Sequence, residues 1–196
     1  MMKSPLSAVF MTLAGLVSLP VEADQAATGV ITFQGAVNDT TCTINGHNTS
    51  SLTVALSPIS VDQANYLSRG GLIPVNRQPF QLDLSDCTQA GANDGWAPTI
   101  KMSFSGSQVS EDGKFLKNEV MGKNGKPNNV GIAITEQDNP DHLISLNEPY
   151  DTDITQESTV KGPQPLKFYA NYYKTGNGEA SAGAVRTLVT YALSYN

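Results

Sequence analysis

Two cysteines and two histidines are the residues of this chain best suited to covalent or metal chemistry: Cys42, Cys87, His47 and His142. An even pair of cysteines in an exported chain predicts one disulfide. On the chain-entropy model, closing the loop between the cysteines stabilises the folded chain by about 4 kcal/mol. The alternatives fit less well, because a structural metal site needs more ligands than these side chains supply and a redox pair is more often a CxxC motif.

The other polar groups do not form a recognisable catalytic site. His142 lies beside Asp138 and Asp141 in a stretch typical of a turn, so a solvated loop is favoured over a metal site. Residues 151–153 (DTD) lack the rest of a calcium loop, residues 122–126 (GKNGK) lack the spacing of a phosphate loop, and no GxSxG motif is present. We therefore expect no enzyme activity, no metal and no cofactor.

The length and the net charge of the chain limit which folds and which binding partners are plausible. The chain has 196 residues, of which 39% are hydrophobic and 15% are charged, and this is enough for one domain with a core. Its formal net charge of -6 makes nucleic acid and an anionic membrane surface poor partners. The search for a function therefore turns to proteins as partners.

The N-terminus has the pattern of a signal peptide. Lys3 supplies the positive charge, residues 6–19 form an apolar run, Pro20 interrupts it, and residues 21–23 (VEA) offer a cleavage site. The apolar run is too short to span a bilayer comfortably, and no second run follows it. We expect cleavage after Ala23 and export of the mature chain.

Short segments with alternating apolar and polar residues follow. β-Branched and aromatic side chains recur at every second position, which is the pattern of a half-buried strand, and turn-forming residues fill the connections. The predicted strands are residues 52–60, 80–87, 99–106, 129–136, 165–175 and 183–196. Residues 60–67 have the composition of a helical turn. About seven short antiparallel strands with one disulfide predict an all-β, immunoglobulin-like sandwich.

The stretch that opens the mature chain also alternates. Residues 28–42 (TGVITFQGAVNDTTC) place Gly29, Ile31 and Phe33 in one register, although chain ends are usually loose and polar. An ordinary first strand of the chain's own sandwich would explain this pattern, and on the pattern alone it is the favoured explanation. The other explanation is a strand that inserts into a second molecule.

A series of motifs resembles the pilin subunits of bacterial chaperone–usher fimbriae. The segment GVITFQGAV (29–37) precedes the first cysteine, and the pattern FxLxLxxC (80–87) carries the second. A YYKTG turn (172–176) and an alternating C-terminal strand come next, with Gly183 fourteen positions from the end and Tyr195 penultimate. The resemblance covers nearly the whole mature chain, and with it the donated strand becomes the favoured explanation of the opening stretch.

This resemblance implies an incomplete immunoglobulin-like sandwich that lacks its last strand. Residues 1–23 would be the signal peptide, residues 24–34 an N-terminal donor strand, and residues 35–196 the pilin domain. In such subunits a chaperone strand fills the groove in the periplasm, and the donor strand of the next subunit replaces it in the fibre. The donor residues implied are Gly29, Ile31 and Phe33. The groove and chaperone-binding residues implied are Gly183, Val185, Val189, Tyr191, Leu193 and Tyr195.

The implied function is that of a structural subunit of an adhesive fimbria, which polymerises by donor-strand exchange and attaches the cell to surfaces. The implied partners are identical or related pilin subunits, a periplasmic chaperone and an outer-membrane usher, with a host receptor as a further candidate. The implied location is the cell surface, reached through the periplasm. The alternative is a minor or tip-associated subunit that binds carbohydrate. Trp96 would be its candidate stacking ring, although packing at a strand start is favoured for that residue.

Overall fold

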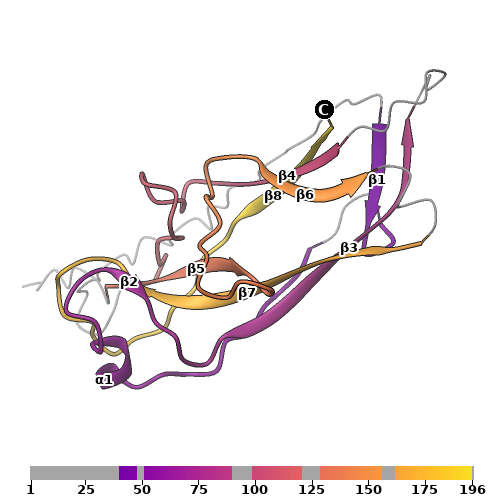
Figure 1. Ribbon diagram of the computed structural model, residues 1–196. Helices are drawn as coiled ribbons and strands as arrows, with labels where there is room; N and C mark the ends of the chain where they lie inside the picture. The colour runs from indigo at the N-terminus through magenta and orange to yellow at the C-terminus, as the bar shows by residue number, and fades with distance from the viewer. Residues whose placement is uncertain (1–39, 48–50, 90–98, 121–128, 156–161, 196) are drawn as a thin grey trace, which may run out of the picture. The chain divides into compact units, whose positions relative to one another are not determined.

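The computed structural model describes residues 40–47, 51–89, 99–120, 129–155 and 162–195 (Figure 1). The chain divides into two units, Met1–Ala36 and Val37–Asn196, and every described residue belongs to the second unit. The expected signal peptide and donor strand, with Gly29, Ile31 and Phe33, lie outside the described residues, as does Trp96.

Two antiparallel sheets form the fold. The first sheet has the strand order β1-β3-β7-β2, with β5 also paired to β7, and the second has the order β6-β4-β8. The strands of the first sheet are β1 (Thr40–Ile44), β2 (Gly71–Leu72), β3 (Gln78–Gln89), β5 (Val130–Glu136) and β7 (Gln164–Lys174). The strands of the second are β4 (Thr99–Ser105), β6 (Tyr150–Thr155) and β8 (Thr190–Tyr195). The predicted all-β sandwich is therefore confirmed.

Alternation in the sequence accounts for several of these strands. Side chains of a strand point to opposite faces in turn, and in β4 the residues Ile100, Met102 and Phe104 are buried while their neighbours are less so. The predicted strands 80–87, 99–106, 129–136 and 165–175 correspond to β3, β4, β5 and β7. The predicted helical turn is also present as α1 (Val61–Ala64), which Ser60 caps in a capping box with Gln63.

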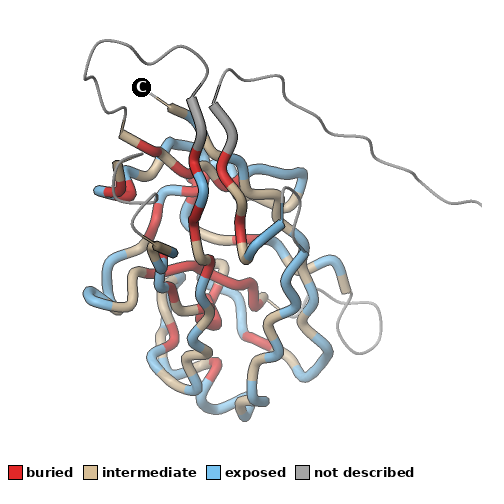
Figure 2. Tube along the Cα trace, turned by 90° about the vertical axis from the view of Figure 1, so that its right-hand side faces the viewer, coloured by how far each residue is buried: buried red, intermediate tan, exposed pale blue. Residues whose placement is uncertain are grey.

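An aromatic cluster joins the two sheets. The ring of Phe168 in β7 lies 5.4 Å from that of Phe80 in β3, 5.9 Å from that of Phe104 in β4 and 5.9 Å from that of Tyr150 in β6. Buried residues recur along the trace between exposed ones (Figure 2), and most of the core residues belong to the strands. The core of the second unit is thus the space between the inner faces of the two sheets.

Strand β5 is buried on both faces, unlike the half-buried strand that its alternation predicted. Two neighbouring segments cover its edge: Leu116 exchanges backbone hydrogen bonds with Ile132 (2.7 and 3.0 Å), and the N–H of Ile144 donates to the carbonyl of Ile134 (3.0 Å). Covering an edge in this way removes a site for unwanted strand pairing.

Two expectations about strands were wrong. Residues 52–60 contain no strand, and the C-terminal strand begins at Thr190 rather than at residue 183. A strand is defined by hydrogen bonds to a neighbour, and alternation in the sequence reports only which side chains face inward. Conversely, β6 was not predicted, because residues 151–153 were assigned to the surface. Asp151 and Asp153 are indeed exposed, but Thr152 between them is buried.

The disulfide between Cys42 and Cys87 is confirmed, and it joins β1 to β3. His47 is exposed in the turn after β1. His142 lies in a turn, as predicted, where its backbone N–H donates to the carbonyl of Asn139 (2.9 Å).

In the described part of the chain, no helix has the length and hydrophobicity needed to cross a membrane.

Phe168 should be the most sensitive position of the core. We expect Phe168→Ala to lower the free energy of unfolding by about 3–5 kcal/mol, because it leaves a cavity where three rings meet. Tyr66→Ala is the control, since Tyr66 is 78% exposed. Urea denaturation of both variants measures the difference, and equal midpoints would show that the cluster does not support the core.

Candidate strand-binding groove

The C-terminal residues form one wall of a groove. Val185, Val189, Tyr191 and Leu193 are half-buried and pack against the core. Between them Arg186, Leu188 and Ala192 are exposed, Leu188 by 71%. The alternation therefore runs from residue 185 to residue 195, although only β8 is a strand. β8 pairs with β4 from Ser105↔Thr190 to Ile100↔Tyr195. It is an edge strand of its sheet.

The second wall is the segment 51–59. Val54, Leu56 and Ile59 are half-buried against the core, and Leu52 is 47% exposed. No backbone hydrogen bond joins residues 51–57 to any other residue that the structure describes. This segment thus places apolar side chains as a strand does and yet has no ladder among the described residues.

Hydrogen bonds tie the C-terminal residues to the rest of the second unit at two points. At one end the N–H of Cys42 donates to the phenol oxygen of Tyr195 (3.2 Å). At the other end Asn65 exchanges two hydrogen bonds with the backbone of Ala180 (2.8 and 3.1 Å). These hydrogen bonds place Cys42 beside Tyr195 and Asn65 beside Ala180. We call the half-buried residues of the segments 51–59 and 185–195 the groove.

A buried lysine secures the end of the groove at Asn65. The side chain of Lys174, in β7, is almost fully buried, and its ammonium group donates to Asn65 Oδ1 (3.0 Å) and to the carbonyl of Leu67 (2.7 Å). Asn65 is also the C-cap of α1. A buried ammonium group requires such acceptors because its transfer out of water is costly. The Asn65–Lys174 contact therefore fixes both α1 and the chain at Ala180.

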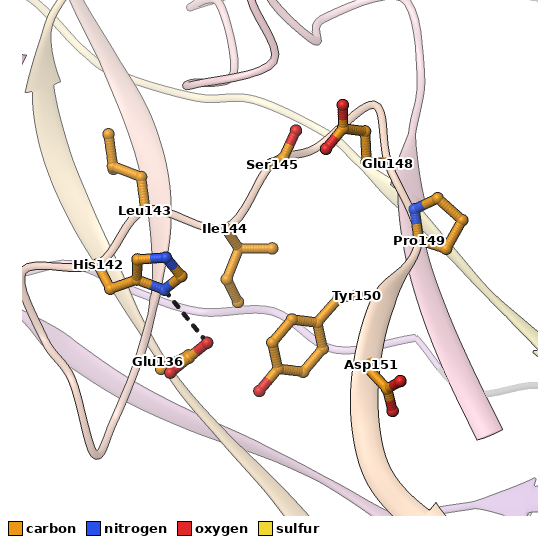
Figure 3. A pocket seen from close by; sticks show the side chains of 9 residues that line it. All are labelled: Glu136, His142, Leu143, Ile144, Ser145, Glu148, Pro149, Tyr150 and Asp151. Atoms are coloured by element: carbon orange, nitrogen blue, oxygen red, sulfur yellow. Dashed lines mark hydrogen bonds and ion pairs between the residues drawn. The ribbon is translucent and has the colours of Figure 1, made fainter. Parts of the chain in front are cut away.

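A shallow pocket lies elsewhere, between the turn that contains His142 and β6 (Figure 3). His142 Nδ1 lies 3.3 Å from Glu136 Oε1. Burial raises the pKa of Tyr150, and the nearby Glu136 carboxylate raises that pKa further. The pocket gathers acidic groups, but the described residues contain no cluster of three or more metal-ligating side chains.

Sequence reasoning named residues of one wall and none of the other, and the role of the named residues as a groove for a strand stays a prediction. Val185, Val189, Tyr191, Leu193 and Tyr195 lie in one inward-facing row, as expected, and Gly183 is exposed just before it. The wall at 51–59 was instead expected to be a paired strand. Asn65 and Lys174 were not considered. The alternation of residues 166–174 places Lys174 on the core face, which is the signal that was available for it.

The contact between Asn65 and Lys174 predicts that substitutions at these two positions lower the free energy of unfolding by different amounts. Asn65→Ala should lower the free energy of unfolding by about 2–3 kcal/mol, because it leaves the Lys174 ammonium group short of an acceptor. Lys174→Met should lower the free energy of unfolding by less, since it removes the buried charge together with its hydrogen bonds. Urea denaturation of the two variants and of the double variant measures this order. A larger loss for Lys174→Met would contradict the assigned contact.

Comparison with known proteins identifies the family. The model of the family described as "Fimbrial protein" matches residues 31–196. Major fimbrial subunit SMF-1 of Stenotrophomonas maltophilia (strain K279a) is 27% identical, over 92% of this chain and 99% of that protein. A major fimbrial subunit of Haemophilus influenzae is 25% identical, over 96% of each chain.

Solved structures agree in fold. A chain in a structure of a chaperone–usher pilus has a TM-score of 0.54 and 18% identity, over 87% of this chain and 97% of that one. The P pilus rod subunit PapA has a TM-score of 0.53 and 16% identity, over 79% of this chain and 99% of that one. The sandwich is thus of the incomplete, immunoglobulin-like kind. From the match of the family model over residues 31–196, the chain belongs to the fimbrial protein family.

Proposed function

We propose that this chain is a structural subunit that polymerises into an adhesive fimbria by donor-strand exchange. Residues 24–34 of one copy enter the groove of another copy, and Gly29, Ile31 and Phe33 face its floor. The observation that carries the proposal is the wall at residues 51–57, which presents apolar side chains and has no backbone partner among the described residues. The proposed role needs no catalysed reaction and no cofactor.

The composition of the donor segment suits this groove. An added strand gains affinity from main-chain hydrogen bonds and specificity from alternate side chains that enter pockets. Ile31 and Phe33 are apolar residues at alternate positions, and their burial contributes about 1.5–3 kcal/mol each. Gly29 lies in the same register and permits close approach of the two backbones. Val185, Val189 and Leu193 are half-buried, so they have apolar surface left to cover.

Donation of a strand from one end to a groove elsewhere gives a filament. Such an interface is head-to-tail, and it builds an open fibre unless the rotation between copies closes a ring. An empty groove exposes apolar surface and strand-forming backbone, which favours aggregation. We therefore infer a periplasmic chaperone that fills the groove until assembly, an outer-membrane usher, and a final location on the cell surface, where the fibre mediates attachment.

Phe33→Asp should block assembly, because a carboxylate at that position would be buried in the groove without a partner. Thr32→Asp is the matched control: it adds the same charge at the neighbouring position, which faces away in the alternation. We expect the first variant to be exported and to form no long fibres, and the second to form fibres at close to the normal yield. Electron microscopy and quantification of fibres sheared from cells measure this, and normal fibres of Phe33→Asp would refute the donor role.

A further inference from the structure

Tyr195 makes a contact that links the two sheets at the end of the chain. Its phenol oxygen accepts a hydrogen bond from the N–H of Cys42 over 3.2 Å. Tyr195 belongs to β8 in one sheet, and Cys42 belongs to β1 in the other. The two residues are 153 positions apart in sequence, so the bond ties β8 to β1, the last and the first strand of the described residues.

A β-bulge places the Cys42 N–H where it meets this phenol. The register of β1 and β3 shifts between Thr41↔Thr88 and Thr43↔Ser85, so that Cys42 lies opposite two residues of β3, Asp86 and Cys87. Asp86 has a φ of 50°, in the left-handed region. A bulge disrupts the ladder locally, and the N–H of Cys42 donates to Tyr195.

The residues around this hydrogen bond are largely buried, and this makes its loss costly. Cys42 is only 9% exposed and is held by the disulfide to Cys87, so its N–H sits in a fixed and nearly dry position. The Tyr195 ring packs against the core. Burial raises the pKa of Tyr195, and a phenol is already neutral at physiological pH with its ordinary pKa of about 10. A buried N–H that loses its acceptor is costly, so the bond should resist opening.

We propose that Tyr195 is a positioning residue of the pilin: its hydroxyl fixes the end of β8 to the disulfide-linked strand β1 and so holds the wall at residues 185–195 in place at that end of the groove. The inference rests on the proposed function, because a fixed groove matters only if a strand enters it. The ends of chains usually fray. With its penultimate residue anchored, β8 presents an ordered edge to the incoming strand, and that strand is retained longer.

Removal of one oxygen atom tests this role. Tyr195→Phe keeps the ring and deletes the acceptor, and Tyr66→Phe makes the same change at a tyrosine that is 78% exposed. In the full chain carrying Tyr195→Phe, we expect the Cys42 amide to exchange with deuterium about five- to tenfold faster. We also expect fibres of that variant to dissociate in hot detergent faster by a similar factor. Tyr66→Phe should match the parent in both measurements.

The two readouts separate the possible failures. Parent-like exchange at Cys42 in Tyr195→Phe would overturn the bond itself. Faster exchange with unchanged fibre dissociation would leave the bond as a purely structural contact and overturn the positioning role. Absence of fibres from the parent chain would refute the proposed function and with it the positioning role, while exchange at Cys42 would still decide the bond. If Tyr195→Phe is not recovered folded, a fluorinated tyrosine at position 195 weakens the acceptor without removing it, and the same two outcomes apply.

Discussion

The need of buried or half-buried backbone for hydrogen-bond partners is the constraint on which this structure depends. N–H and C=O groups removed from water without partners cost free energy, so natural sandwiches pair, cover or shorten their edges. In this chain the edge of β5 is covered by Leu116 and Ile144. The wall at residues 51–57 has no such cover among the described residues. The same molecule therefore protects one edge and leaves another segment suited to a partner strand.

The groove differs from the core in packing. The Phe168 cluster is closed, with ring contacts that span both sheets. Val185, Val189 and Leu193 touch that core from one side only and stay half-buried. The hydrogen bonds of Asn65 and Tyr195 fix the two ends of the groove. When a strand enters a groove whose ends are already fixed, less conformational entropy is lost, because fewer residues of the groove become ordered on binding.

Periodicity predicted those parts of the fold in which one face of a strand packs on the core. It found β3, β4, β5 and β7, and it found the inward row from Val185 to Tyr195. It does not report hydrogen-bond partners, so residues 52–60 were assigned to a strand. It also missed β6, because the aspartates on both sides of the buried Thr152 were interpreted as a surface segment. The contact between Asn65 and Lys174 joins residues 109 positions apart, and no local pattern encodes such a pair.

The most direct test of strand complementation uses a chain from which residues 24–34 are deleted, mixed with a synthetic peptide of those residues. At saturating peptide, burial of Ile31 and Phe33 should raise the thermal unfolding midpoint by about 10–20 °C. A peptide carrying Asp in place of Phe33 should give little or no rise. If instead the deleted chain alone is a stable monomer whose midpoint the native peptide does not change, the groove is not completed by this segment and the account is wrong.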